Sequence, residues 1–325
     1  MTARMITLEN ADFIRKINFS TDLNAVADLI EMCFPISSDP DGQAYVQQMR
    51  KTAQDYENMK RRGGLGRFDM TRSSGFVWVE KGEIIGNLSM IPCLQDNRRV
   101  TLIANVVVHP DQRGRGIGKA LTVYALKYLK QRGDHKAWLQ VKEDNHSAIH
   151  LYRSVGFEEQ AVRNTWRIKP FQANRSAADR FRPIRLRRRT PSDWKDQQAW
   201  LMETYPLHLR WNLPVNFSRF APGCMQAITN FLDGYPHRHW VVSGETQSLG
   251  AITWQKTTTY ADNLWLAFSE PQEELYLRNA LIGVLKRLSR RHPVSIDYAR
   301  GRSEQVFEDL GFENFRTLIW MSCRI

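Results

Sequence analysis

Residues 102–132 are predicted to form a strand, a glycine-rich turn and a helix, and this order constrains the fold more than any other stretch of the chain. Residues 102–108 are apolar except for Asn105 and include three consecutive valines, which is typical of a strand buried on both faces. Pro110 ends this strand. Apolar side chains then recur at helical spacing at Ile117, Leu121, Tyr124, Ala125, Tyr128 and Leu129.

The turn at residues 112–119 reads Gln-Arg-Gly-Arg-Gly-Ile-Gly-Lys. Alternating glycines allow a left-handed backbone and leave no Cβ in the way, so several N–H groups can converge on one anion. The helix that follows adds its free N–H groups and its dipole. Because Arg113, Arg115 and Lys119 bring positive charge to the same place, we expect a phosphate or pyrophosphate ligand. An ordinary solvated turn has the same composition.

Two common phosphate loops fail on spacing. A G-x-G-x-x-G fingerprint starting at Gly114 would need glycine at Lys119, and a Walker loop ending at Lys119 would need glycine at Arg113. The pattern R/Q-x-x-G-x-G/A is present at residues 113–118 and resembles the pyrophosphate loop of the GNAT superfamily of N-acetyltransferases. The resemblance implies acetyl-CoA as co-substrate. The residues that it places on the pyrophosphate are Arg113, Gly114, Arg115, Gly116, Ile117, Gly118 and Lys119.

Residues 137–157 strengthen the resemblance. They predict a strand at 137–141, a helix N-cap at Asp144 or Asn145, a short helix at 146–154 and a glycine, Gly156, just past its end. An Asn, a Tyr and a Gly-Phe pair recur in this order in the second acetyl-CoA-binding segment of GNAT enzymes. In that family the two strands splay apart around the pantetheine arm. The residues placed on the arm here are Val106, Val107, Val108, Asn145 and Tyr152.

The resemblance also implies a mechanism. An amine attacks the thioester directly in a ternary complex, a main-chain N–H near Val108 stabilises the oxyanion, and Tyr152 gives a proton to the departing thiolate. Tyr152 fits a core aromatic residue as well. The general base stays open, because the first splayed strand carries only Asn105 among apolar residues. The other candidates are Glu31, Glu80, a chain of waters and His109, which fits a role in the turn better.

The segment from about Cys33 to Asp69 is expected to form the acceptor side of the cleft, but it does not identify the acceptor. A helix that starts at Asp22 precedes this segment, and a second helix is predicted at 41–59. The glycine-rich loop at 61–67 fits either a substrate lid or a flexible surface connection.

The remaining strands complete a mixed, mostly antiparallel, twisted sheet flanked by helices, an α/β (α+β) fold. The pattern predicts strands at 13–19, 76–79, 83–90, 97–108 and 160–168, with a hairpin turn at Lys81-Gly82.

The second half of the chain resembles the first, and 325 residues exceed what one core usually supports. Residues 183–186 parallel 13–16, residues 239–254 parallel 75–90, and residues 306–314 parallel 151–159. We therefore expect tandem GNAT-like domains. The predicted boundaries are 1–170 for the catalytic domain, 171–182 for a linker and 183–325 for a degenerate copy.

The second copy has lost the residues expected to bind the cofactor. After a strand at 263–268, a loop at 269–274 has no glycine and three acidic side chains. Phe307 stands in place of Tyr152, and Arg300 lies near the position of Asn145. The following helix keeps an apolar stripe at Leu277, Leu281, Val284, Leu285 and Leu288. We expect a cofactor-free domain that packs on the first as an intramolecular pseudo-dimer, with the oligomeric state open.

Composition narrows the class of protein. Mean hydropathy is −0.48, and neither a long apolar run nor a hydrophobic signal segment is present, so we expect no membrane span and a cytoplasmic location. The four cysteines lie far apart without a C-x-x-C pair, which indicates neither a metal site nor disulfides. The net charge of +12 is spread evenly, with 26 Lys and Arg against 19 Asp and Glu in residues 1–175. Such a surface attracts polyanionic CoA.

The sequence therefore predicts an N-acetyltransferase that acts on a primary amine of a small molecule or peptide. A non-catalytic acyl-CoA sensor with the same fold is the alternative. A nucleic-acid-binding protein is a third reading, but the even spread of charge does not favour it.

Overall fold

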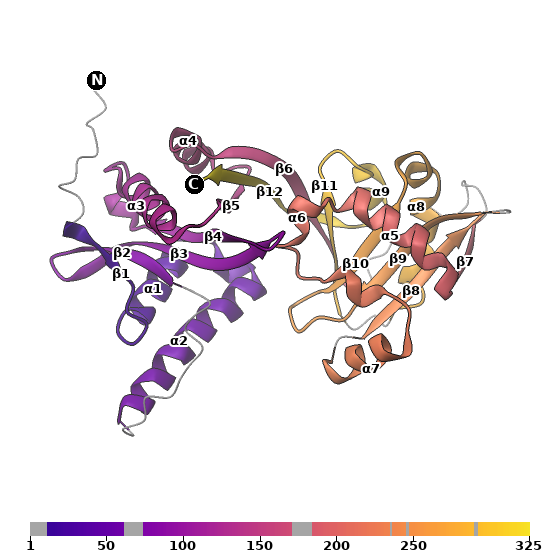
Figure 1. The fold of residues 1–325 in the computed structure, drawn as a ribbon, viewed down its shortest axis with the longest axis horizontal. Coiled ribbons are helices and arrows are strands. Elements are labelled where there is room, and N and C mark those ends of the chain that lie inside the picture. The colour runs from indigo at the N-terminus through magenta and orange to yellow at the C-terminus, as the bar shows by residue number, and fades with distance from the viewer. Residues whose placement is uncertain (1–11, 62–73, 171–183, 235, 245–246, 289–291) are drawn as a thin grey trace. The chain divides into compact units, whose positions relative to one another are not determined.

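The computed structural model describes residues 12–61, 74–170, 184–234, 236–244, 247–288 and 292–325. The chain splits into two compact units (Figure 1). Unit 1 comprises Met1–Gln160 and Ile319–Ile325, and unit 2 comprises Ala161–Leu318.

Unit 1 is built around a mixed sheet. Its elements in chain order are β1 (Ile14–Lys16), α1 (Leu23–Cys33), the 3₁₀ helix η2 (Ile36–Ser38), α2 (Pro40–Arg61), β2 (Ser74–Glu80), β3 (Glu83–Gln95), β4 (Arg98–Val108), η4 (Pro110–Gln112), α3 (Ile117–Arg132), β5 (Lys136–Lys142) and α4 (His146–Ser154). The strands β1 to β4 pair antiparallel in chain order, whereas β5 runs parallel to β4.

Helices cover both faces of this sheet (Figure 1). On one face, α1 and α2 share a hydrophobic core with Val77 and Val107. On the other face, α3 packs so closely that a Cβ at Gly86 would lie 3.1 Å from Ile117. The stripe predicted for α3 is confirmed at Ile117, Leu121, Ala125 and Leu129, which are at most 2 % exposed. Its other two members, Tyr124 and Tyr128, are half-buried and pack edge-on against Phe76. The predicted hairpin turn at Lys81 and Gly82 is also confirmed, with left-handed φ values of +50° and +84°.

The strand β4 contains a bulge next to Asn105. Asn87 of β3 opposes Val107, but Ser89, two residues further on, opposes Ala104, so β4 has one residue more than its partner. Asn105 lies at this bulge and has a left-handed φ of +50°. A non-glycine residue rarely adopts this conformation, and bulges often lie beside functional sites.

Unit 2 repeats the same plan. Its elements are β6 (Glu158–Ile168), β7 (Arg185–Arg188), η6 (Pro191–Asp193), α5 (Trp194–Thr204), α6 (Leu207–Arg210), η7 (Phe217–Phe220), α7 (Cys224–Leu232), β8 (His237–Ser243), β9 (Ser248–Gln255), β10 (Asp262–Phe268), α8 (Glu270–Leu285), β11 (Val294–Ala299), α9 (Glu304–Asp309) and β12 (Glu313–Arg324). The strands β7 to β10 pair antiparallel, and β11 runs parallel to β10.

The compact units do not follow the predicted domain boundaries at 170 and 183. The strand β6 begins in unit 1, but its residues from Ala161 belong to unit 2, where β6 pairs antiparallel with β11 from Arg163↔Ala299 to Ile168↔Val294. Conversely, Ile319–Ile325 at the end of β12 belong to unit 1. In each half of the chain, the end of the last strand therefore belongs to the other unit. Local sequence patterns could not predict this exchange. The predicted linker, 171–182, lies outside the described residues.

The sheet register aligns the two halves differently from the sequence pattern. In unit 1, Arg15 of β1 opposes Val77 of β2. In unit 2, Arg187 of β7 opposes Val241, which holds the same position in its hairpin. Arg187 is therefore the equivalent of Arg15. The sequence pattern had instead aligned Arg185, two residues earlier, with Arg15. A shift of two residues keeps every side chain on its face, so the pattern could not detect it.

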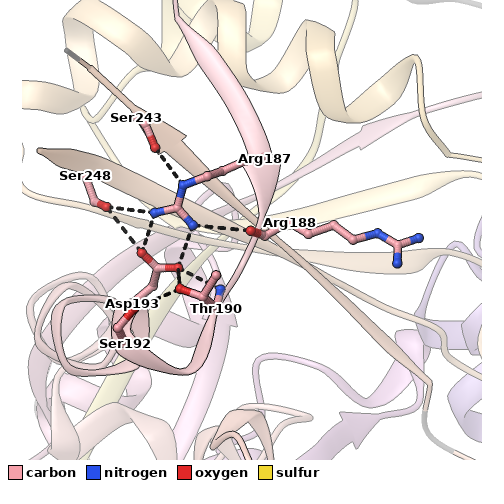
Figure 2. Close-up of polar contacts among 7 residues, drawn as sticks. All are labelled: Arg187, Arg188, Thr190, Ser192, Asp193, Ser243 and Ser248. Atoms are coloured by element: carbon pink, nitrogen blue, oxygen red, sulfur yellow. Dashed lines mark hydrogen bonds and ion pairs between the residues drawn. The ribbon is translucent and has the colours of Figure 1, made fainter. Parts of the chain in front are cut away.

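Both equivalent arginines bind the aspartate that starts the next helix. Arg15 donates to Asp22 at 2.5 and 3.0 Å, and Arg187 donates to Asp193 at 2.5 and 2.7 Å. Figure 2 shows how the unit 2 pair is extended by Thr190, Ser192, Ser243 and Ser248, with Arg187 also reaching the carbonyl of Arg188. The guanidinium holds the pKa of Asp193 well below its usual range. This pair fixes the strand to the helix in both units.

No helix among the described residues is long and apolar enough to cross a membrane. The same residues contain no group of three or more His, Cys, Asp or Glu side chains arranged to hold a metal ion. All four cysteines are free.

Candidate active site

The glycine turn ends at the start of α3. Gly114 and Gly116 adopt left-handed φ values of +79° and +83°, and Gly116 is the N-cap residue. A Cβ at either position would meet no atom within 4 Å, so the space above the turn is open. Gly118 is different, because a Cβ there would lie 3.2 Å from Leu151 of α4. The turn therefore presents the free N–H groups of a helix start to an open space.

Two of the three basic side chains of the turn already have protein partners. Arg113 Nε donates to the carbonyl of Val108 at 3.3 Å. Arg115 binds the carboxylate of Glu80 at 2.8 and 3.1 Å. The bond from Arg115 holds the pKa of Glu80 below its usual range. An incoming pyrophosphate would compete with this carboxylate for Arg115, while the main-chain N–H groups are available without rearrangement.

The strands β4 and β5 separate beside the turn. They pair in parallel only from Val100↔Lys136 to Ile103↔Leu139. β4 continues to Val108 and β5 to Lys142 without further pairing between them in the described residues. The splay expected from the GNAT resemblance is therefore present.

The main-chain groups of β4 alternate between β3 and the gap that opens between β4 and β5. The N–H of His109 bonds to Ile85 of β3 at 2.9 Å. Because antiparallel bonding alternates, Val107 also directs its main-chain groups to β3, whereas Val108 directs them away. The carbonyl of Val108 accepts from Cys33 Sγ at 3.3 Å. Of the predicted main-chain contacts, Val108 thus has its N–H on the gap side, and Val107 does not.

Asn145 and Tyr152 lie at the two ends of α4. Asn145, rather than Asp144, is the N-cap residue, and its Oδ1 accepts from the N–H of Ala148 at 3.1 Å. Its amide Nδ2 remains a donor. Tyr152 is 7 % exposed, and its ring packs edge-on against Phe157. Burial raises the pKa of Tyr152 well above its usual range, so its hydroxyl stays protonated and able to donate.

Comparison with known proteins agrees with this geometry. The sequence profile of the acetyltransferase (GNAT) family matches residues 24–157, a range that contains the turn, the splayed strands and α4. Residues 24–157 belong to the GNAT family.

Two curated relatives of the GNAT segment are named as N-acetyltransferases. An uncharacterized N-acetyltransferase of Methanocaldococcus jannaschii is 44 % identical over 71 residues, which are 22 % of this chain and 31 % of that protein. The ribosomal protein bS18-alanine N-acetyltransferase of Escherichia coli K12 is 39 % identical over 62 residues, which are 19 % of this chain and 42 % of that protein. The chain thus matches less than half the length of these relatives.

A solved structure extends the GNAT fold to the whole chain. A tandem GNAT protein from the clavulanic acid biosynthesis pathway aligns over 96 % of this chain and 98 % of that chain, with a TM-score of 0.53 and 16 % identity. At this identity the likeness establishes the fold alone. The prediction of two tandem GNAT-like domains is confirmed.

The base candidates in the GNAT segment are engaged in other contacts. Glu31 Oε2 pairs with Arg50 at 2.7 Å, and Glu80 pairs with Arg115 as described above. His109 caps η4, since its Nδ1 accepts from the N–H of Asp111 at 3.3 Å, which confirms its expected role in the turn. Sequence reasoning missed Tyr45 of α2, whose hydroxyl lies 2.7 Å from Asn105 Nδ2 at the bulge.

The second copy lacks the connection that carries the glycine turn. In unit 1, residues 109–116 join β4 to α3, whereas in unit 2 only Ser269 separates β10 from α8. The prediction of an acidic loop at 269–274 is therefore wrong, because residues from Glu270 onward are helical. Glu273 is 2 % exposed and accepts hydrogen bonds from Arg302 and Ser303. A buried carboxylate of the chain itself thus binds cationic and hydroxyl donors near the start of α8.

A tyrosine side chain lies beside the splayed strands of unit 2. The strands β10 and β11 pair only at Asp262↔Val294 and Asn263↔Ser295. Beyond this point the N–H of Leu266 donates to the hydroxyl of Tyr205 at 3.3 Å. By sheet register, Leu266 is the equivalent of Val106. Tyr205 is fully buried, so the chain itself satisfies a main-chain group that the first copy is expected to offer to pantetheine.

Proposed function

We propose that the protein is an acetyl-CoA-dependent N-acetyltransferase that moves an acetyl group to a primary amine by direct attack in a ternary complex. The observation that carries this proposal is the splay of β4 and β5 next to a left-handed glycine turn at the start of α3. The turn suits a pyrophosphate, and the gap suits an extended arm that needs main-chain partners. The family match at residues 24–157 supports the same activity.

In this proposal each part of acetyl-CoA has its own partners. The pyrophosphate binds the first N–H groups of α3 together with the basic side chains of residues 113–119. The pantetheine arm pairs with main-chain groups of Val106 and Val108, and the Nδ2 of Asn145 donates to it. A main-chain N–H on the gap side of β4, near Val108, then stabilises the developing oxyanion.

The transfer forms an N–C bond and breaks the C–S bond of the thioester. The attacking amine loses one proton, and the departing sulfur gains one from the hydroxyl of Tyr152. With Glu31 and Glu80 paired to arginines, we propose that water carries the amine proton to solvent. The reprotonation of Tyr152 from solvent completes the cycle.

We further propose that unit 2 binds no cofactor and acts as a structural partner of the catalytic domain in a cytoplasmic enzyme. Its short β10–α8 connection and the burial of Tyr205 and Glu273 support this. The sensor alternative shares the cofactor site and differs only in turnover.

The experiment that tests the function is release of free CoA thiol from acetyl-CoA by the purified full chain, across amino acids, peptide N-termini, simple monoamines, polyamines and aminoglycosides. We expect turnover that Gly116→Glu abolishes and Tyr152→Phe slows. Tyr124→Phe on α3 is the matched control and should leave the rate unchanged. Tight acetyl-CoA binding without turnover on any amine would favour the sensor.

A further inference from the structure

Four neutral polar side chains gather at the bulge of β4. Asn105 Nδ2 donates to the hydroxyl of Tyr45 at 2.7 Å and to Ser89 Oγ at 3.4 Å. Asn87 Nδ2 donates to the carbonyl of Asn105 at 2.9 Å and to Ser89 Oγ at 3.3 Å. These residues come from α2, β3 and β4, which are far apart in sequence. We name Tyr45, Asn87, Ser89 and Asn105 the bulge cluster.

The inner side of the bulge cluster is held by a buried hydrogen bond, whereas its outer side is exposed. Asn87 is fully buried and holds the carbonyl of the left-handed residue Asn105, which fixes the bulge. The Oδ1 of Asn87 is buried without a hydrogen-bond partner. Such a group lowers the stability of the fold, so its presence indicates that the geometry of the bulge is needed. In contrast, Tyr45 is 46 % exposed, and Ser89 and Asn105 are half-buried. A ligand can therefore reach the outer side of the bulge cluster.

The bulge cluster lies at the acyl end of the proposed cofactor path, so the inference that follows rests on the proposed function. The pyrophosphate turn follows Val108, and the arm runs back along β4 toward Val106. Asn105 is the next residue along this strand, and at about 3.3 Å per residue it lies roughly 10 Å from Val108. An amine that attacks the thioester from the α2 side would pass the bulge cluster.

The bulge cluster contains no charge. Burial of its hydroxyl raises the pKa of Tyr45, although the bond from Asn105 opposes this, so the phenol is neutral. The hydrogen bonds that join the bulge cluster all link neutral groups, and the carboxylates of Asp28 and Glu31 on α1 pair with Arg50. A polyamine acceptor bound at the bulge cluster would thus bury a second or third ammonium group, which would lose its hydration without gaining a negatively charged partner.

The charge of the whole chain acts in the same direction. Residues 1–175 carry an excess of seven positive charges, from 26 Lys and Arg against 19 Asp and Glu, and the complete chain carries +12. A field of this sign attracts anions and repels polycations from a distance.

We propose that Tyr45, Ser89 and Asn105 form the acceptor subsite, and that the acceptor is a monoamine whose remainder is uncharged or anionic. The two hydroxyls and the Asn105 amide hold the neutral amine and its neighbouring polar group beside the thioester. Polyamines and aminoglycosides, which carry several cations, are then poor acceptors. Asn87 is a positioning residue that acts through Asn105.

The test compares initial rates of CoA release with glycinamide, glycine and benzylamine against spermidine and kanamycin. We expect kcat/KM to favour the best monoamine over both polycations by at least tenfold, with a gap that narrows at high salt as charges are screened. Tyr45→Phe should raise the acceptor KM by roughly 2- to 10-fold, the effect of one lost hydrogen bond. The affinity for acetyl-CoA should not change. Tyr56→Phe, on the same helix, is the matched control.

A second variant tests the role of charge. Asn105→Asp is isosteric and keeps a residue type that tolerates the left-handed backbone. The new carboxylate should lower the KM for spermidine relative to glycinamide, and thermal unfolding checks that the fold is retained. If spermidine or kanamycin is the best acceptor and neither variant changes its KM, the inference is overturned while the proposed function stands. If no amine is acetylated, the proposed function itself fails, and the inference fails with it.

Discussion

Replacing Gly116 by alanine separates the binding role of the turn from its structural role. Gly116 has a φ of +83°, and its Cβ would project into open space next to the first N–H groups of α3. Gly133 at the other end of the same helix has a φ of +80° and equally open surroundings. The two positions therefore impose the same backbone strain on alanine, but only one borders the proposed pyrophosphate site.

The expected magnitudes differ between stability and binding. A left-handed alanine costs about 1–2 kcal/mol, so Gly116→Ala and Gly133→Ala should lower the melting temperature of the unit by similar amounts, roughly 2–8 °C. In Gly116→Ala the added methyl group also displaces one or more N–H contacts to the pyrophosphate. One hydrogen bond to a charged group contributes about 1.5–3 kcal/mol, which corresponds to a roughly 10- to 150-fold weaker affinity for acetyl-CoA.

Calorimetric titration with acetyl-CoA and thermal unfolding of the two variants make the comparison. We expect Gly133→Ala to bind acetyl-CoA like the unmodified chain despite its lower melting temperature. Equal loss of affinity in both variants would mean that destabilisation alone explains it. Unchanged affinity in Gly116→Ala would refute the assignment of the turn as the pyrophosphate site.

Two further predictions concern unit 2. Tyr205→Phe leaves the N–H of Leu266 without its hydroxyl partner, so the free energy of unfolding should fall by about 1–3 kcal/mol, while acetyl-CoA affinity measured by titration stays unchanged. Arg187 lowers the pKa of Asp193, so this pair stabilises the fold above the ordinary carboxyl pKa of about 4 and the contribution is lost as the pH falls below it. Asp193→Asn should therefore be less stable than the unmodified chain at pH 7, with a difference that shrinks toward pH 2 in denaturant unfolding.

Local patterns in the sequence predicted the elements of unit 1 and the positions of the turn and α4. The strand at 102–108, the glycines of the turn and the stripe of α3 are each fixed by neighbours in the chain, so composition and spacing suffice. The bulge at Asn105 was not predictable in this way, because it depends on Asn87 and Ser89 of β3. Tyr45 was missed for the same reason, since only the folded chain brings α2 to β4.

The errors in unit 2 also have physical causes. An acidic segment with proline suggested a loop at 269–274, but proline and acidic side chains are equally suited to the first turn of a helix, and α8 begins there. The two-residue error in aligning β7 with β1 preserved the alternation of faces and so left no signal in the pattern. The exchange of the ends of β6 and β12 involves partners more than 100 residues apart, which no local pattern encodes.

Comparison of the two copies distinguishes residues that the fold requires from residues that the proposed chemistry requires. The arginine–aspartate pair recurs in both units as Arg15–Asp22 and Arg187–Asp193, so its role is to join the first strand to the first helix. The glycine turn occurs only in unit 1, although α8 of unit 2 packs without it. A left-handed glycine turn costs conformational entropy and supplies no core contact. Its presence in one copy alone is therefore best explained by a ligand, and the bulge at Asn105, absent from the regular β9–β10 register, follows the same logic on the acceptor side.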